Sequence, residues 1–399
     1  MLSALCCDIM SGVGLWAVVK REVREMLRNR LYCSVVFVLP LVMLLFFTIM
    51  FYGGAIDNLP VALVDRDKTP MSQELVDMIE ATPGIDIAHE TQSINEAEQL
   101  MLKDKASAII YIDKGFERKI YEGVPTEVEC YVSGVNLSAS GVVERDLQTV
   151  VETFSSGVAL SKLSSLGVEY EAAMADVMPI NLHTNIVGNP YLNYGYYLAP
   201  IFMFMGLVIF IVVSATYAVG RELRYGTAKE WLGIAGDSSL SAVVGKLLPL
   251  TITFTLYTQL IYFILFFVMG MECSGSYVML SLGGFLLVLA YQSIALFIVT
   301  ATSNLRLALS LGGGYAVMAF TFSGITFPVM AMYGVAQWLS KLFPLTYFSK
   351  ILISQAVVDA PEFYNVKDFV FLTLFVLLPL VLWRQFGRVV REDQYWGME

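Results

Sequence analysis

The sequence predicts an α-helical membrane protein with six transmembrane helices and an extracytoplasmic α/β domain between spans one and two. Apolar residue types make up 57% of the 399 residues and charged types only 15%, with a mean hydropathy of +0.66. A soluble domain carries about 45–50% apolar and roughly 25% charged residues. The composition therefore excludes a single soluble globular protein, and five cysteines in this length exclude a disulfide-stapled scaffold.

Six apolar runs are candidates for crossing a bilayer, which takes about 20 helical residues. The first covers residues 31–52, and the other five lie within residues 196–386, at about 196–219, 247–271, 277–301, 307–324 and 369–383. The first run is too long for the apolar region of a signal peptide, and no small-residue cleavage site follows Tyr52. We therefore interpret it as a retained span.

Basic residues in the short flanks set the expected orientation. Five precede the first span within residues 1–30, four lie between the second and third spans, and three follow the sixth, whereas the loop at 272–276 has none. The pattern predicts a multi-pass membrane protein with both termini in the cytoplasm. Residues 387–399 then form a cytoplasmic tail.

Acidic residues are concentrated between the first two spans. Residues 53–195 hold 9 Lys/Arg and 22 Asp/Glu, whereas the rest of the chain holds 16 Lys/Arg and 13 Asp/Glu. We expect this block to be the extracytoplasmic α/β domain, with a solvated acidic surface. Nucleic-acid binding needs a basic stripe, so the charge argues against a nucleic-acid partner.

Strand and helix signals alternate within the acidic block. Short apolar runs predict strands at 60–65, 85–88, 108–112 and 127–132. A helix is predicted at 71–81 with Thr69 or Ser72 as its cap, and another from Ser93 to about residue 105, where Glu96 would complete a capping box. The order βαβαββ is typical of a small α/β sandwich.

A long helix is predicted over about residues 140–166. Five apolar residues recur in it at spacings of three and four, namely Val143, Leu147, Val150, Phe154 and Val158. Such a stripe predicts a packing face first and a partner-docking face second.

Residues 13–30 predict an amphipathic helix before the first span. The apolar positions are Trp16, Val19, Val23, Met26 and Leu27, and the polar positions are Lys20, Arg21, Glu22, Arg24, Glu25 and Arg28. Such a helix would lie in the inner membrane interface with its cations near anionic lipid headgroups. A surface-packed helix is the alternative. We expect Trp16, Lys20, Arg21, Arg24 and Arg28 to define the interfacial helix.

The fifth apolar run is too long for one helix. Gly324 and Pro328 interrupt it, and a second apolar stretch follows to Val358. Non-helical backbone at membrane depth is tolerated only when it packs in protein or lines a cavity. We expect a re-entrant region at 325–358, with a plain amphipathic outer loop as the alternative.

The loop at 220–246 holds a short predicted helix at 227–234. Glycines flank it, and it carries Glu230 and Trp231. A helix of this kind could seat in a groove of a partner protein, with Trp231 as the anchor. An ordinary loop helix is the alternative.

This loop resembles the first cytoplasmic loop of permeases in the type-2 ABC transporter membrane family. The matching residues are Glu222, Gly226-Thr227, Glu230, Trp231-Leu232 and Gly245-Lys246, and one departure is Ala235-Gly236-Asp237 in place of the usual Thr-Pro. Segments in other parts of the chain resemble the family's long external loop branch, which is multidrug and efflux-like: 59–79, 106–120, 189–200, 322–329 and 342–348.

The resemblance implies a permease subunit of an ATP-driven ABC exporter. It implies a partner ATPase subunit that binds ATP and Mg²⁺, a second permease copy (identical or related) and a possible periplasmic adaptor. The residues implied in ATPase coupling are Glu222, Gly226, Thr227, Glu230, Trp231 and Lys246. We place the substrate path between the two copies and assign to it Met203, Phe204, Phe320 and Phe322, with lipid-facing or core packing as the alternative. An uncharged path of this kind favours a hydrophobic or amphiphilic cargo, drug-like or lipid-like.

Other function classes are less favoured. The only Gly-Lys pair, Gly245-Lys246, lacks the glycine and hydroxyl residues of a phosphate-binding loop, so we expect no ATPase site or bound cofactor. An ion-coupled secondary transporter usually has Asp, Glu or His within its spans, and the six apolar runs contain none. His89 and His183 are isolated, so no metal or catalytic site is expected. A membrane receptor or sensor with an external binding domain stays the main alternative.

Overall fold

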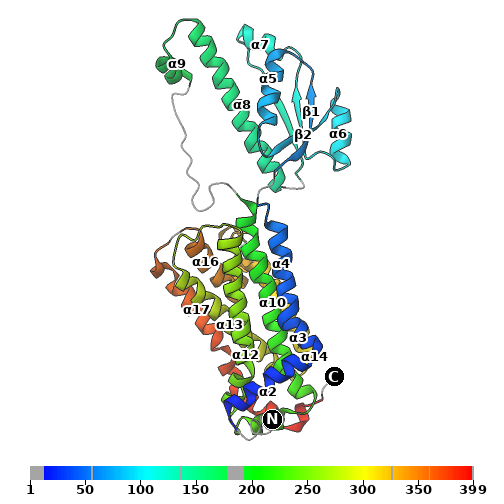
Figure 1. The fold of residues 1–399 in the computed structure, drawn as a ribbon, viewed down its shortest axis with the longest axis vertical. Helices are drawn as coiled ribbons and strands as arrows, with labels where there is room; N and C mark the ends of the chain where they lie inside the picture. The colour runs from blue at the N-terminus through cyan, green and yellow to red at the C-terminus, as the bar shows by residue number, and fades with distance from the viewer. Residues whose placement is uncertain are drawn as a thin grey trace, which may run out of the picture. The chain divides into compact units, whose positions relative to one another are not determined.

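The computed structural model describes residues 13–54, 57–134, 137–177, 193–324, 327–358 and 360–397 (Figure 1). The chain divides into two compact units, one formed by Met1–Gly54 with Ile186–Glu399 and the other by Ala55–Asn185. The described part of the first unit is helical, whereas the second combines a four-stranded sheet with helices. The predicted His183 and residues 1–12 lie outside the described residues.

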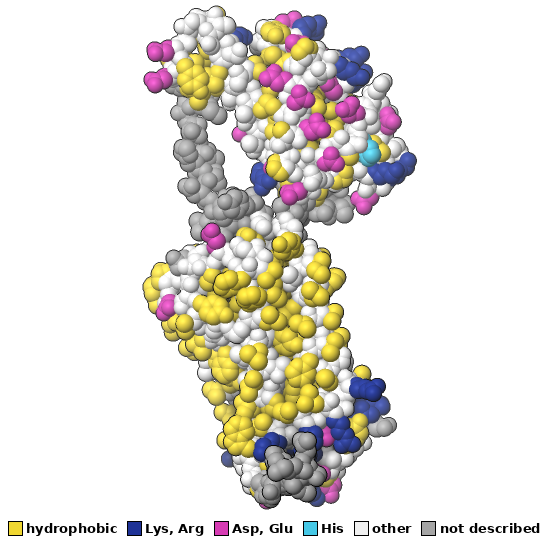
Figure 2. Space-filling view, viewed as in Figure 1, with side chains coloured by type: hydrophobic (Ala, Val, Ile, Leu, Met, Phe, Trp, Pro, Cys, Tyr) yellow, Lys and Arg dark blue, Asp and Glu magenta, His cyan; other side chains and the backbone are white. Residues whose placement is uncertain are grey.

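Six helical segments of the first unit are long and apolar enough to cross a membrane. They are Arg30–Phe51, Gly195–Arg224, Ser239–Val268, Tyr277–Thr302, Leu305–Phe322 and Glu362–Arg391. The six predicted spans are therefore confirmed as helices. On the face shown in Figure 2, a broad band of hydrophobic side chains covers this unit, and Lys and Arg gather at the end that carries α2 (Leu15–Arg28).

Several of these segments are longer than the apolar runs that predicted them. Helix α10 spans Tyr194–Arg224, and α12 spans Ser239–Phe263, so Glu222 and Lys246 lie inside helices and not in the loop between them. The expected start of the third span near residue 247 was too late, because α12 begins where the Ser238 side chain accepts a hydrogen bond from the Ser241 amide. Helix ends follow such caps and not the end of apolarity.

Two of the first five spans contain a π-helical turn. The first span consists of α3 (Arg30–Cys33), a π-helical turn η1 (Ser34–Val38) and α4 (Leu39–Phe51), and α12 ends in a second π-helical turn, η2 (Ile264–Val268). The fourth and fifth spans are α13 (Tyr277–Thr302) and α14 (Leu305–Phe322). Each span of the first five is therefore close to continuous.

The sixth segment is broken into four pieces. These are η4 (Glu362–Asn365), α17 (Val366–Val376), η5 (Leu378–Leu382) and α18 (Trp383–Arg391). Pro379 lies in η5, where it has no amide hydrogen to give to an α-helical ladder. The sixth segment continues beyond its expected end at residue 383 through α18. The arginines of α18 are exposed, whereas Phe386, Val389 and Val390 are buried.

The core of the first unit lies around α10 and α13. In the most apolar part of each of these two helices, 61% of the residues are buried, compared with 22% in the first span and 6% in the sixth. Helix α10 packs against α14, α13, α12 and α4. The first and sixth spans therefore present most of their apolar side chains outward, where lipid or another chain can cover them.

Short helices follow α14, as the interrupted fifth run predicts. They are η3 (Val329–Ala331), α15 (Gly334–Ser340) and α16 (Pro344–Ala356), with residues 325 and 326 outside the described part. Phe348 and Ile351 of α16 are almost fully buried, and the helix packs against α13 and α17. That this region re-enters the membrane stays a prediction.

The second unit is built on a four-stranded sheet with the order β2-β1-β3-β4. The strands are β1 (Leu59–Asp65), β2 (Ile85–Glu90), β3 (Ala108–Ile112) and β4 (Val128–Val132). Strand β1 pairs in parallel with β2 and β3, and β4 is antiparallel to β3. The four predicted strands are confirmed.

Helices cover both faces of this sheet. Val61 and Leu63 pack with α5 (Pro70–Glu80), α7 (Phe116–Glu122) and the apolar stripe of α8 (Leu137–Ser165). Ala62 and Val64, which point to the other face, pack with α6 (Ile94–Leu102). A final helix, α9, covers Tyr170–Val177. The stripe of α8 is therefore a packing face, as predicted.

Helix α7 was not predicted, so the order is βαβαβαβ. It begins after Gly115, which has a positive φ of 79°, and Asp67 accepts hydrogen bonds from the amides of Gly115 (2.6 Å) and Glu117 (2.9 Å). Helix α5 is capped by Thr69, which forms a capping box with Ser72. Ser93 caps α6 by accepting from the Glu96 amide. Seven residues are too few for α7 to show a clear apolar period.

Candidate functional site

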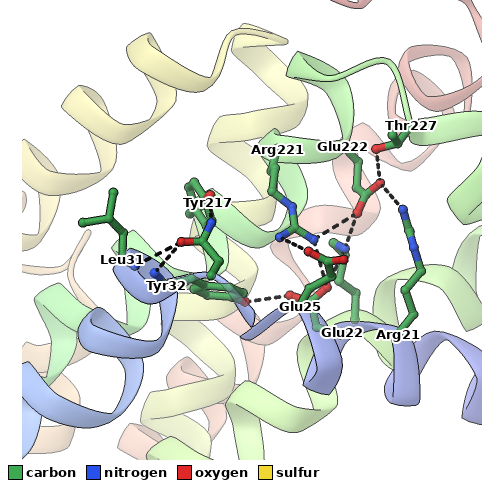
Figure 3. Close-up of polar contacts among 11 residues, drawn as sticks. Arg21, Glu22, Glu25, Leu31, Tyr32, Tyr217, Arg221, Glu222 and Thr227 are labelled. Atoms are coloured by element: carbon green, nitrogen blue, oxygen red, sulfur yellow. Dashed lines mark hydrogen bonds and ion pairs between the residues drawn. The ribbon is translucent and has the colours of Figure 1, made fainter. Parts of the chain in front are cut away.

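Six ionisable side chains from three helices meet at one end of the first unit, and we call them the ion cluster (Figure 3). They are Arg21, Glu22 and Glu25 of α2, Arg221 and Glu222 of α10, and Lys246 of α12. Three carboxylates face three cations, so the formal charges balance. The ion cluster thereby ties the helix before the first span to the second and third spans.

Lys246 lies at the centre of the ion cluster. Its Nζ is 2.7 Å from Glu22 Oε2 and 2.7 Å from Glu222 Oε1. All three side chains are at most 1% exposed. A buried ion is costly without a partner, so each of the three charges depends on the others for its stability.

Two arginines complete the pairing. Arg21 Nη2 lies 3.1 Å from Glu222 Oε2. Arg221 lies 3.4 Å from Glu25, 3.6 Å from Glu222 and 3.9 Å from Glu22. Glu222 therefore contacts all three cations and is the hub of the ion cluster.

Aromatic and amide groups tie the start of the first span to the same place. The Tyr32 hydroxyl donates to Glu22 Oε1 at 2.7 Å, and the Arg221 guanidinium lies 6.0 Å from the centre of the Tyr32 ring. Asn29 accepts from the Leu31 and Tyr32 amides and donates to the Tyr217 hydroxyl at 2.8 Å. The bend between α2 and α3 is thereby fastened to α10.

The loop helix α11 (Ala228–Ile234) is linked to the ion cluster through its first turn. The Thr227 hydroxyl donates to Glu222 Oε2, and the Thr227 amide donates to the Glu222 carbonyl at 2.9 Å. Gly226, with φ of 68°, makes the reversal between α10 and α11. A displacement of α11 is therefore passed directly to Glu222.

Trp231 corrects one expectation about this helix. We expected it to anchor in a groove of a partner, but its side chain is fully buried. Lys246 Nζ lies 5.1 Å from the centre of the indole, and Phe386 of α18 packs at 6.3 Å. Trp231 therefore packs α11 against the helices of its own chain. The sequence pattern of a short helix with one tryptophan is the same whether that tryptophan packs in a partner protein or in the same chain.

The outward face of α11 carries different residues. Glu230 is exposed, as are Gly226 and Gly233. Lys229 is also exposed and pairs with Asp393 at 2.8 Å. Among the residues implied in ATPase coupling, Glu222, Trp231 and Lys246 are thus internal, whereas Gly226 and Glu230 are accessible.

The amphipathic helix α2 also differs from the expectation. Its bundle-facing residues are Val18, Glu22 and Met26, whereas Trp16 and Leu27 are exposed. Lys20, Arg24 and Arg28 are exposed as expected, but Arg21 is partly buried in the ion cluster. Trp16, Val23 and Leu27 form an exposed apolar face, and the interfacial placement of α2 stays a prediction. A separate, buried face contains Glu22, a charged residue that periodicity assigns to solvent.

Close packing between α2 and α12 depends on Gly245. A Cβ at this position would lie 2.8 Å from the Val18 Cβ and 2.9 Å from the Leu15 carbonyl oxygen. The Gly245-Lys246 pair therefore has a structural explanation. Gly245 leaves room for the close approach of α2, and Lys246 forms an ion pair with Glu22 of α2.

The four residues assigned to a substrate path are packed within this chain. Met203 and Phe204 have no appreciable exposure, and Phe204 packs on Phe348 with ring centres 4.6 Å apart. Both side chains therefore pack in the core of this chain, as the core-packing alternative describes, and their role in a path between two copies stays a prediction. Phe320 and Phe322 are partly buried, against Phe202 and Phe343 respectively, and their role in a path stays a prediction.

Sequence reasoning did not identify Glu22, Glu25, Arg221 and Tyr32 as parts of one site. The available signal was that acidic and basic residues occur together at helix ends that were expected on the same side. Within the described residues, no group of three or more His, Cys, Asp or Glu side chains is placed to hold a metal ion. The acidic residues of the ion cluster are instead neutralised by Arg and Lys.

Comparison with known proteins gives two findings. Residues 30–384 match a family described as ABC-2 family transporter protein. The chain is 20% identical over 344 residues to a protein named "Probable multidrug ABC transporter permease YbhR" of Escherichia coli strain K12, covering 84% of this chain and 88% of that one. A protein of the same name in Escherichia coli O157:H7 gives the same values.

Proposed function

Because the chain belongs to the ABC-2 family of transporter proteins and is an ABC transporter permease, we propose that it is the membrane subunit of an exporter powered by a separate nucleotide-binding subunit. The ion cluster is the single observation that carries the proposed mechanism. It joins α2 and α11, the two elements proposed to contact the ATPase, to the spans α10 and α12.

The ion cluster makes these four elements move as one body. Separating a buried pair leaves an uncompensated charge, which costs about 3–5 kcal/mol. That cost is several times the thermal energy, so a load on α11 tilts α10 and α12 before it breaks the ion cluster. The ATPase's closure on ATP would thereby open a path between two permease copies.

Each coupling residue has a separate proposed role. Glu230 and Gly226 on the exposed side of α11 would meet the ATPase, and Trp231 would carry the load to Lys246 and α18. Thr227 would carry it to Glu222. The exposed Arg24 of α2 would serve the same contact or the lipid surface.

The orientation is proposed from the basic end of the first unit. Lys20, Arg24 and Arg28 gather with α11 and α18 at one end, which the positive-inside tendency places in the cytoplasm. Both termini then lie in the cytoplasm of a bacterial cell, and the acidic α/β unit lies outside, where a periplasmic adaptor could bind it. We propose that the second permease copy is this chain or a related one.

A hydrophobic or amphiphilic cargo is supported by a cavity beside α10. It has a volume of about 300 Å³, and its apolar lining includes Ile201 of α10, Leu352 of α16, and Met271 and Val357 from the segments that follow η2 and α16. Tyr196 adds a polar hydroxyl at its edge. Pockets that bind small apolar ligands have this combination of an apolar wall and few polar groups.

The proposal can be tested in proteoliposomes that contain the chain and its cognate ATPase. The purified chain alone should hydrolyse no ATP, and the complex should. Glu230→Ala should lower turnover by the complex at unchanged thermal stability, because Glu230 is exposed and contributes nothing to the core. The matched control is Lys103→Ala, an exposed charge of the second unit. ATP turnover by the isolated chain would refute the division of labour.

A further inference from the structure

Two adjoining cavities lie on the side of the bundle formed by α12, α13 and the sixth segment. The first, which we call the apolar groove, has a volume of about 570 Å³ and includes Val244, Leu248, Phe285, Leu289 and Leu380. The second, which we call the basic cavity, has about 560 Å³ and includes Ser238, Arg384, Arg388 and Arg391. Both are lined by Leu240 and Trp383, so one continues into the other.

The apolar groove contains buried polar groups that lack a partner. Thr251 donates to Gln292 Oε1 at 2.8 Å, but Gln292 Nε2 has no hydrogen-bond partner among the described residues, although the side chain is only 2% exposed. Thr255 Oγ1, from the same groove, is likewise buried and unpartnered within that part of the chain. A buried donor without an acceptor is destabilising.

The basic cavity is suited to a phosphate. Arg384, Arg388 and Arg391 follow one another by four and three residues, so they share a face of α18. None of the three forms an ion pair with another described residue, although Arg391 donates to the Asp237 carbonyl at 3.3 Å. The first turn of α12 lies on the opposite wall, with Ser238 and Ser239, and its amides favour an anion.

We propose that the apolar groove and the basic cavity together bind one anionic phospholipid. Its phosphate lies among the three arginines, and its acyl chain follows α12 along the apolar groove. Between Leu240 and Thr255 the apolar groove follows α12 for 15 residues, or about 22 Å. That exceeds the roughly 15 Å depth of one leaflet, so an acyl chain starting at the interface has room along its whole length.

Charge complementarity favours a lipid over the other occupants of an apolar groove. With Glu392 as its one acid, the basic cavity carries a net charge of about +2, which the single negative charge of a phospholipid phosphate halves. Free phosphate would leave the apolar groove empty. A second copy of this chain would have to bring an acidic group to the same place. The lipid is a resident of the bundle and not the exported cargo, so the inference does not depend on the transport proposal.

Lipid titration of the purified full-length chain tests the proposal. The probes are phosphatidylglycerol and phosphatidylcholine, added in detergent micelles, with retained lipid counted by native mass spectrometry. We expect retention of one phosphatidylglycerol and weaker retention of phosphatidylcholine. Arg384→Gln/Arg388→Gln should weaken phosphatidylglycerol binding about 30-fold, because each basic residue near an anionic lipid contributes roughly a fivefold change in affinity. Phosphatidylcholine binding should fall less, because its choline cation already offsets the charge of its phosphate.

A matched charge control separates this site from general attraction. Arg224→Gln/Arg306→Gln removes two exposed arginines of the same unit and should leave phosphatidylglycerol binding intact. Equal losses in the two double variants would contradict a specific site.

A groove variant tests the acyl-chain contacts. Val244 is exposed in the apolar groove, so Val244→Trp should fold, with an unchanged unfolding temperature, yet exclude both lipids. Unaltered lipid retention in Val244→Trp, displacement of phosphatidylglycerol by inorganic phosphate at equal concentration, or a change of oligomeric state in place of lipid loss would each overturn the proposal.

Discussion

Lys246→Met should strongly destabilise the first unit. The substitution preserves the length of the side chain but removes both 2.7 Å ion pairs, and it changes the formal charge of the ion cluster from zero to −1. Glu222 keeps Arg21 at 3.1 Å, but Glu22 keeps only Arg221 at 3.9 Å and the Tyr32 hydroxyl. Breaking a buried pair in this way costs about 3–5 kcal/mol. That is a large share of a typical stability of about 5–15 kcal/mol.

The loss is measured as the free energy of unfolding of the detergent-purified chain, for example by titration with a denaturing detergent. Lys246→Met/Glu22→Gln restores a balanced ion cluster, with Arg21 and Arg221 facing Glu25 and Glu222, so it should recover at least ~2 kcal/mol. The matched control is Arg118→Met, which removes an exposed pair with Glu122 at 3.8 Å and should cost below about 1 kcal/mol. Equal effects of Lys246→Met and Arg118→Met would show that the ion cluster is solvated and refute the reasoning.

Three further predictions concern other parts of the chain. Gly245→Val should push α2 away from α12, because a Cβ at this position would lie 2.8 Å from the Val18 Cβ, and it should lower the free energy of unfolding by about 1–3 kcal/mol. Limited proteolysis should then cleave α2 in Gly245→Val but not in Gly233→Val, which lies on the open side of α11. Equal protection of α2 in both variants would disprove the prediction. Burial, with Glu144 nearby, raises the pKa of the Cys130 thiol to about 11. At pH 8 the thiol should therefore alkylate about 100-fold more slowly in the folded chain than in the unfolded chain. Mass spectrometry of the peptide that contains Cys130 measures the two rates, and equal rates would contradict the prediction. Burial alone would raise the pKa of Asp67, but hydrogen bonds from the Glu117 amide, the Thr69 hydroxyl and the Gly115 amide lower it. Asp67 therefore stabilises the second unit above about pH 4, and this contribution disappears as the pH falls further. Asp67→Asn should make the stability of that unit depend less on pH in the acid range, and an unchanged dependence would argue against the capping role.

The spans and the α/β unit could be predicted because their signals are local. Each apolar run long enough to cross a bilayer became a helix, and the stripe of α8 from Val143 to Phe154 became a buried face. Short apolar runs predicted strands such as β1. These patterns depend on neighbouring residues along the chain, and no distant partner is needed to interpret them.

The ion cluster could not be predicted in the same way. Glu22 and Arg21 occupy the polar face of an amphipathic helix, and that pattern is the same whether the face meets water or a lysine of another helix. Arg21 and Glu222 are separated by 201 positions, and Lys246 and Glu22 by 224. Only tertiary packing decides which polar residue is buried, and the same is true of Trp231.

The central claim is that α2 and α11 drive the spans through the ion cluster. Its most direct test measures ATP hydrolysis and transport of an amphiphilic dye in the same proteoliposomes, with the cognate ATPase and either the unaltered chain or Lys246→Met/Glu22→Gln. The account predicts continued hydrolysis with about tenfold less dye moved per ATP, the size of an ordinary coupling free energy. An unchanged amount of dye per ATP in the variant, at equal folding and assembly, would contradict it.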